Sequence, residues 1–262
     1  MQTVWKGTIS FGLVSIPVKL VSATQEKDIS FRQVRVSDGS RVRYRRVAES
    51  DGEEVAYADI AKGYELPDGG MVVLTDDDMA SLPVASSKAV DVLQFVDAGE
   101  IDPAAYSRAY YAMPTGDAKP YVLLRDALAS SGRVAVVKMA MRSRERLAIL
   151  RPAGDALVVQ TMLWPDEVRS PELPAEVADV EPRQQEMAMA ASFIDAMSGD
   201  WAPQDYTDEY REAIEGLVAS KVEGREIVMP PAADGDEAEV VDLMDALRQS
   251  VDAANKRREK SA

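Results

Sequence analysis

The sequence contains no cysteine and no histidine, and only 6% of its 262 residues are aromatic. Without cysteine, the chain can form neither a disulfide framework nor a catalytic thiolate. Without histidine, it lacks the usual base of a serine or cysteine nucleophile and the commonest ligand of transition metals. P-loop, GxGxxG, HExxH and CxxC motifs are also missing, and the carboxylates form no recognisable acid–base pattern. We therefore expect a binding protein without a cofactor, not an enzyme.

Long apolar runs are missing as well. None approaches the ~20 residues that a membrane-spanning helix needs. The opening MQTVWKGTIS lacks the basic and apolar blocks of a signal peptide. We therefore expect a cytoplasmic protein with no membrane contact, long enough to form one large domain or two small ones.

Positive charge is scarce overall but concentrated in two blocks. The formal net charge is −15, yet residues 1–46 carry +6 and residues 119–164 carry +5. The segments 47–118 and 165–255 are acidic, with −12 and −17. Because nucleic-acid binding needs a local positive surface and not a positive total, this block pattern outweighs the low overall pI.

The densest positive block is FRQVRVSDGSRVRYRR, with six arginines and one aspartate between Phe31 and Arg46. Asp38-Gly39 is a strong two-residue turn signal, so the pattern predicts a β-hairpin in which Val36 faces Arg41. Directly opposed residues share one face of a hairpin. The arginines that this register brings to one face are Arg32, Arg41, Arg43 and Arg45.

Like charges gathered on one face are destabilising unless an anion lies against them. A polyanion such as the phosphate backbone of a duplex would satisfy them. A solvated edge hairpin, whose arginines prevent pairing between sheet edges, fits the same residue types. The residues alone leave both interpretations open.

A second basic stripe lies in VAVVKMAMRSRERLAILRPAGDALVVQTML, which predicts three strands in a meander. One face of the first strand is apolar and comprises Ala135, Val137, Met139 and Met141. We expect Lys138, Arg142 and Arg144 on the opposite face. A solvated outer face is the alternative.

Three further patterns bear on the fold and the site. AVDVLQFV and YSRAYYAM indicate strands, and KPYVLLRDALASS indicates a helix ending at Gly132. The run Thr75 to Asp78 has capping-box spacing, which we favour over a metal-binding cluster. The tyrosines at positions 106, 110 and 111 suit core and rim packing better than stacking on bases.

The C-terminal third indicates helices beyond a Pro-rich acidic linker at 166–182. Helices are expected at about 183–198, 207–224 and 237–255. The order of elements predicts a β-barrel or sandwich followed by a helical arm. Since an apolar stripe such as Met187, Ile194 and Met197 must be buried against something, the arm points to a partner chain.

Long collinear segments of the chain resemble bacterial Ku, the DNA-end-binding protein of non-homologous end joining. They are GTISFGLVSIPVKLVSAT, RVRYRRV, DIAKGYEL, MVVLTDDDMASLP, AKPYVLLRDAL, GRVAVVKMAMRSRERLAILRP and LVVQTMLWPDEVR. A later segment, DWAPQDYTDEYREAIEGLVASKVEG, is similar to the family's helical C-terminal segment. The resemblance covers roughly residues 3–225.

The resemblance implies a mixed α and β fold, with an antiparallel β-barrel core, an Arg-rich hairpin bridge and a helical C-terminal arm. The implied domains are a core at 1–165 with a bridge at about 28–66, the linker at 166–182 and a dimerisation arm at 183–230. Residues 231–262 would add an acidic linker, an amphipathic helix and a short basic tail.

The implied function is sequence-independent binding of double-stranded DNA ends by a homodimeric ring. The ring would recruit ligase D, an ATP-dependent DNA ligase, and lie with the nucleoid at DNA breaks. The residues expected to contact DNA are Arg32, Arg41, Arg43, Arg45, Arg46, Lys138, Arg142 and Arg144. Some relatives carry a cysteine pair where this chain reads VAESDG at 47–52, so no metal is expected there.

Two other functions remain as alternatives: a sequence-indifferent RNA-binding barrel, and an acidic scaffold whose arginines form internal salt bridges. The last stretch, 237–262, is expected to be dispensable for loading on DNA. The stretch is expected to be needed for full ligase recruitment or for sliding inward from the DNA end, and its stripe of Val240, Leu243, Leu247 and Val251 would dock on a partner as a helix in a groove. In the other interpretation this helix packs on its own dimer.

Overall fold

The computed structural model describes residues 2–81, 88–142, 144–174, 177, 180–224 and 243–261. The chain divides into two compact units, Met1–Ser170 and Pro171–Ala262, which are described separately. Among the described helices, none combines the length and apolar character needed to cross a bilayer.

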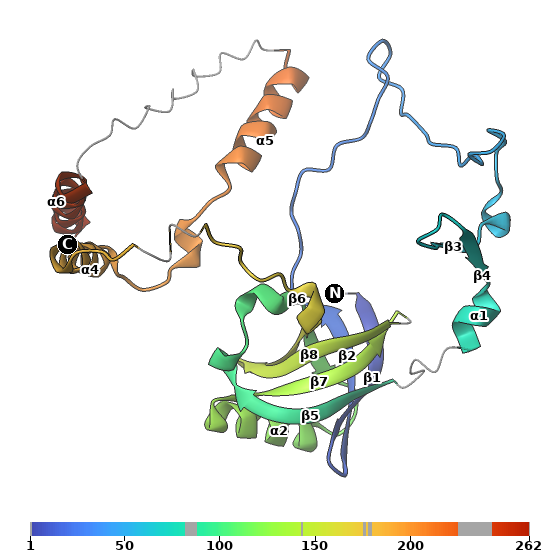
Figure 1. Cartoon of the computed structure of the whole chain (residues 1–262), viewed down its shortest axis with the longest axis horizontal. Coiled ribbons are helices and arrows are strands. Elements are labelled where there is room, and N and C mark those ends of the chain that lie inside the picture. The colour runs from blue at the N-terminus through green and yellow to red at the C-terminus, as the bar shows by residue number, and fades with distance from the viewer. Residues whose placement is uncertain are drawn as a thin grey trace. The chain divides into compact units, whose positions relative to one another are not determined.

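The first unit contains a closed β-barrel of seven described strands, so the predicted barrel is confirmed (Figure 1). Its neighbours follow the order β1-β2-β6-β9-β8-β7-β5. Neighbouring strands are antiparallel except at the closing pair, β1 and β5, which run parallel. The strands are β1 (Thr3–Phe11), β2 (Val14–Ser22), β5 (Ala89–Asp97), β6 (Tyr106–Pro114), β7 (Arg133–Met141), β8 (Arg144–Ala153) and β9 (Ala156–Met162).

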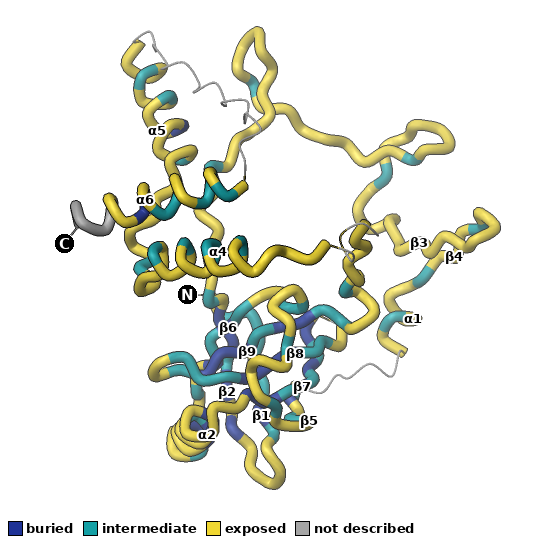
Figure 2. Tube along the Cα trace, turned by 60° about the vertical axis from the view of Figure 1, so that its left-hand side comes forward, coloured by how far each residue is buried: buried dark blue, intermediate teal, exposed yellow. Residues whose placement is uncertain are grey.

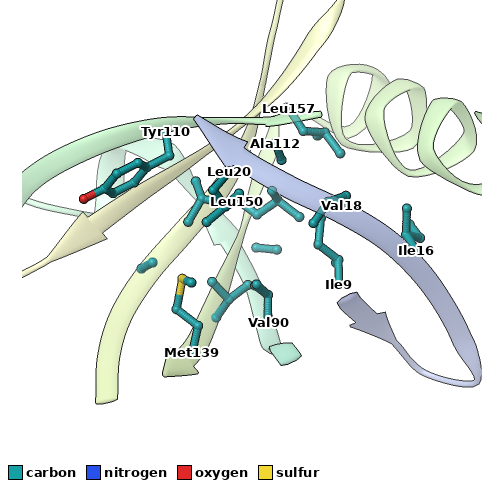
Figure 3. Packing of buried hydrophobic residues seen from close by; sticks show 14 of the residues in the cluster. Ile9, Ile16, Val18, Leu20, Val90, Tyr110, Ala112, Met139, Leu150 and Leu157 are labelled. Carbon is teal, nitrogen blue, oxygen red and sulfur yellow. The ribbon is translucent and has the colours of Figure 1, made fainter. Parts of the chain in front are cut away.

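Alternation along each strand builds the barrel core, because successive side chains point to opposite faces. The predicted apolar face of β7 is confirmed: Ala135, Val137, Met139 and Met141 are all buried. They pack with buried residues from the other strands (Figure 3). These are Ile9, Ile16, Val18, Leu20, Val90, Tyr110, Ala112, Ala148, Leu150, Leu157 and Val159. A smaller cluster around Val134, Ile149 and Met162 belongs to the outer face.

Helix α2 (Ala118–Ser131) covers one end of the barrel core. Its buried Tyr121 hydroxyl donates to the Ala112 carbonyl (2.8 Å) and accepts from the Leu157 N–H (2.7 Å). The helix ends at Gly132, whose φ of +67° is left-handed, as the sequence predicts for a C-terminal glycine. Since Ala112 is near the end of β6 and Leu157 near the start of β9, α2 marks the barrel end where β7 begins.

Between β2 and β5 the chain makes a long excursion whose residues are mostly exposed (Figure 2). It contains a short hairpin of β3 (Lys62–Glu65) and β4 (Met71–Leu74), then α1 (Asp76–Ser81). The capping box predicted at Thr75 is confirmed. The Asp78 carboxylate accepts from the Thr75 N–H (2.8 Å), and the Asp78 N–H donates to the Thr75 hydroxyl (3.1 Å). Hydrogen bonds that Thr75 donates to the Asp78 carboxylate, the hydroxyl's first, lower the pKa of Asp78.

Short 3₁₀ turns complete the first unit and recur in the second. They are η1 (Tyr57–Asp59), η2 (Ala98–Glu100), η3 (Pro103–Ala105), η4 (Pro165–Glu167) and η5 (Pro203–Asp205).

The second unit is helical, as predicted, with α4 (Gln184–Met197), α5 (Glu209–Val222) and α6 (Leu243–Ser261). Helix α6 packs against α4 of the same chain, with Ala254 buried. This contact supports the interpretation in which the last helix packs within its own protein. Val240 of the predicted stripe lies outside the described residues. The backbone of the basic residues 256–260 continues α6, so they do not form a separate tail.

Candidate nucleic-acid interface

The Arg-rich hairpin forms, but its register differs from the prediction by two residues. Val34, and not Val36, lies opposite Arg41, and the Arg35 N–H donates to the Ser40 carbonyl (2.8 Å). The loop is therefore longer than Asp38-Gly39. The reason is local: the Asp38 carboxylate accepts from the Ser40 N–H (3.0 Å) and hydroxyl (2.8 Å), which draws Ser40 into the turn. These bonds, the backbone one first, lower the pKa of Asp38.

A shift of two residues keeps every side chain on its face, because the strand period is two. Continued outward, the observed register sets Arg43 opposite Arg32, so the predicted grouping of even residues before the turn and odd ones after it is retained. The pairing is a single bridge and not a pair of continuous strands. All of the predicted bridge arginines are exposed.

A second hairpin follows directly and was not predicted. Val47 pairs with Glu54, and the Arg46 carbonyl accepts from the Val55 N–H (2.9 Å). Arg45 thereby meets Glu54 at 3.2 Å, with both side chains more than half exposed. An ion pair this exposed contributes little stability and exchanges readily for another anion. The Arg46 guanidinium lies 5.3 Å from the centroid of the Tyr57 ring.

The basic residues of the barrel do not share one face, so that prediction is wrong. Lys138 lies on the outer face, where it pairs with Glu145 (3.0 Å) and approaches the Trp164 ring (5.7 Å). Arg144 instead lies opposite the buried Met141 and therefore faces inward. The cause is the tight turn between β7 and β8. Arg142 adopts a φ of +53°, and only position 143 separates it from Arg144, so the alternation does not continue in phase.

Inward-facing arginines form a feature that the sequence analysis missed. Arg146 lies opposite buried Met139, one step deeper than Arg144. Together with Arg108 and Arg142 they line a hollow of about 340 Å³ at the barrel end opposite α2. We call this the arginine mouth. Its lining is Ser107, Arg108, Tyr110, Met141, Arg142, Arg144, Arg146 and Thr161.

A β-bulge holds Arg108 at this mouth. Tyr106 pairs with Met162 and Ala109 with Gln160, so Ser107 and Arg108 both lie across from Thr161. The buried Thr161 hydroxyl accepts from the Arg108 N–H and donates to the Arg108 carbonyl, both at 3.0 Å. The alternation of 144, 146, 148 and 150 could have revealed the inward arginines of β8, whereas nothing in the sequence marks the bulge.

The arginine mouth lies at the base of the excursion. The chain leaves the barrel after Ser22, which pairs with Tyr110, and returns at Ala89, next to Val90, which pairs with Met139. Tyr110 lines the mouth and Met139 lies one strand period from Met141, so both junctions belong to this barrel end. The excursion that carries the bridge arginines therefore begins and ends at the barrel end where Arg142 and Arg144 lie.

The chain matches the Ku70/Ku80 beta-barrel domain profile over residues 10–189. A protein of Frankia casuarinae named "Non-homologous end joining protein Ku" is 59% identical over 97% of this chain, which spans 64% of that relative's length. The protein of the same name in Mycobacterium tuberculosis (strain CDC 1551 / Oshkosh) is 42% identical over 98% of this chain and 97% of its own length. "Non-homologous end joining protein Ku 2" of Saccharopolyspora erythraea is 45% identical over 97% and 84% of the two chains. The profile match, the barrel and these identities establish that the chain belongs to the Ku family.

Proposed function

We propose that this chain binds the ends of double-stranded DNA whatever their sequence, as a homodimeric ring threaded onto the duplex. In this proposal it recruits and stimulates ligase D in non-homologous end joining and has no catalytic activity of its own. The name carried by its relatives supports the pathway. The domain limits inferred from the resemblance, with the bridge at about 28–66, belong to the same proposal.

The observation that carries the proposal is the concentration of exposed arginines on the bridge of a chain whose net charge is −15. Among the described residues, Arg32, Arg41, Arg43 and Arg46 have no ion pair, and the pair that Arg45 makes is exposed. Phosphate contacts carry no sequence information, so exposed arginines without a fixed base-reading geometry suit binding to any end. The acidic remainder would repel DNA from other faces.

Arg142 and Arg144 would extend this surface at the barrel end from which the bridge leaves. Lys138 is a weaker member, because Glu145 already neutralises it. Base stacking by the three tyrosines of β6 has less support, because Tyr110 is buried in the barrel core and Tyr106 and Tyr111 are half-buried.

The decisive experiment compares binding to linear DNA and to covalently closed circular DNA of the same sequence. A threaded ring should bind the linear form and fail to load on the circle. Equal binding to both would contradict threading. Preference for single-stranded RNA would favour an RNA-binding barrel, and no binding to either nucleic acid would favour an acidic scaffold.

Replacement of Arg41, Arg43 and Arg45 by alanine tests the bridge itself. Affinity should fall equally for unrelated duplex sequences, and the log–log salt slope should drop by about 0.9 for each lost phosphate contact. The matched control replaces three arginines outside the proposed surface, Arg133, Arg169 and Arg248. An equal loss in the control would show that only net charge matters.

A further inference from the structure

The arginine mouth is concave, as a small-anion site is, while its exposed Arg142 and Arg144 also belong to the duplex-binding surface proposed above. Arginines from three places, the bulge of β6, the turn after β7 and the first residues of β8, converge on one hollow. Its volume of about 340 Å³ lies at the lower end of the roughly 300–1,000 Å³ of small-molecule sites. A duplex is convex, so a concave hollow of this size admits only a single protruding group.

The arginines of the mouth lack internal neutralisation. Within the described part of the chain, none of Arg108, Arg142, Arg144 and Arg146 forms an ion pair, and no carboxylate lines the hollow. An adjoining hollow of about 660 Å³ shares Arg108 and Arg142 and adds Arg151 and one acid, Glu26. Positive charges that surround one hollow repel each other and raise the free energy of the empty site. A bound anion lowers this free energy.

Two features fix this arrangement in place. The bulge that aims Arg108 is held by the two hydrogen bonds between the buried Thr161 hydroxyl and the Arg108 backbone. Arg142 is the one described non-glycine residue with a positive φ. A left-handed arginine costs roughly 1–2 kcal/mol. Strain of this kind persists where the surrounding structure enforces it, often at ligand sites.

We propose that the arginine mouth binds a phosphate monoester, either the terminal phosphate of a DNA strand or that of a free phosphorylated solute. A monoester carries a charge of about −1.5 to −2 at pH 7, whereas each internal phosphodiester carries −1. Guanidinium groups bind phosphate oxygens in paired hydrogen bonds, and several converging arginines favour the more highly charged ester. Binding of a DNA terminal phosphate rests on the proposed function, whereas binding of a free phosphorylated solute does not.

The primary test is titration of the full chain with inorganic phosphate, followed by calorimetry and by ³¹P NMR, in chloride buffer at constant ionic strength. We expect saturable binding that Arg146→Gln and Arg108→Gln each weaken at least tenfold. The matched control is Arg133→Gln, at the opposite end of β7. No saturable binding by the wild type, or equal weakening in the control, would overturn the proposal.

Folding is checked independently, because Arg146 is partly buried. Arg108→Gln removes an exposed side chain and leaves the two backbone bonds to Thr161 in place, so it should retain the wild-type unfolding midpoint. Unchanged phosphate affinity in a folded Arg108→Gln and Arg146→Gln double variant would contradict the site.

A second comparison identifies the source of the phosphate. The wild type is titrated with linear duplexes bearing 5′-phosphate or 5′-hydroxyl ends. Tighter binding of the phosphorylated duplex, lost in the double variant, assigns the mouth to DNA termini. If both duplexes bind equally and the wild type still binds inorganic phosphate in the first titration, the arginine mouth is assigned to a free phosphorylated solute. Failure to bind either duplex would overturn the proposed function and leave the phosphate result standing.

Discussion

At the residue scale, two buried hydroxyl groups, those of Tyr121 and Thr161, form hydrogen bonds that hold neighbouring parts of the barrel unit together. The Tyr121 hydroxyl joins α2 to two strands, and burial raises its pKa. Thr161 performs a comparable task at the other end of the barrel. The sequence predicts the burial of apolar residues here, but not these bonds, since they depend on which backbone groups remain unpaired after the barrel closes.

Replacement of Tyr121 by phenylalanine should destabilise the barrel unit by about 1–3 kcal/mol, because the change leaves a buried N–H and a buried carbonyl unpaired. Denaturant unfolding followed by tryptophan fluorescence measures this difference. The control is Tyr111→Phe, at the residue of β6 that precedes Ala112. It should lower the free energy of unfolding by less. Equal unfolding midpoints for Tyr121→Phe and the wild type would show that water replaces the hydroxyl.

Arg142 permits a comparison of two substitutions that both remove its charge. Glycine accepts a φ of +53° without a steric penalty, whereas alanine does not. Arg142→Gly should therefore be more stable than Arg142→Ala by about 1 kcal/mol, measured by urea unfolding. Both variants should bind phosphate equally weakly. Equal stability of the two would mean that the turn relaxes to a negative φ.

At the scale of elements, alternation and capping signals predicted the barrel strands and α2 well. Registers were harder to predict. The Asp38 side chain lengthened the first hairpin loop, and the turn at Arg142 changed which face Arg144 occupies. The bulge at Ser107 and Arg108 directed Arg108 into the arginine mouth. Each of these depends on local hydrogen bonds that a one-dimensional pattern does not contain, so the site was predicted less completely than the fold.

The N-terminus of α5 provides a pH-dependent prediction. The Asp208 carboxylate accepts from the Arg211 N–H (3.0 Å), and this bond is the main reason that its pKa is lowered. Because the pKa of Asp208 is lower in the folded state, its carboxylate stabilises the fold at pH values above its unfolded-state pKa, about 3.9. This stabilisation is lost as the pH falls through the folded-state pKa.

Amide exchange of α5 should therefore accelerate in the wild type as the pH falls below about 4. Asp208→Asn keeps a capping side chain without a titrating group, so its protection should not show this step. Hydrogen exchange read out by mass spectrometry, corrected for the intrinsic pH dependence, compares the two proteins. The same acid step in both would assign it to other carboxylates.

At the scale of the whole molecule, the helical unit has more apolar surface than its described residues cover. The half-buried residues of α4, among them Met189 and Phe193, lie on one face, and α6 is the helix that packs against α4. The predicted stripe of Met187, Ile194 and Met197 lies on an adjacent face and remains 57%, 64% and 58% exposed. Leaving three large apolar side chains in water on one helix is unfavourable, which supports a second copy as the partner.

We therefore expect that Met187→Lys with Ile194→Lys converts the proposed homodimer to a monomer without unfolding it, because each lysine places a charge in the interface. Sedimentation velocity at low micromolar concentration measures the mass, and circular dichroism verifies the helix content. Gln185→Lys with Asp195→Lys adds charge to exposed polar positions of the same helix and should leave the mass unchanged. If the stripe variant remains dimeric, another surface joins the subunits. If the wild type is itself monomeric, a ring closed by two chains is ruled out, and DNA ends would have to be held by a single bridge.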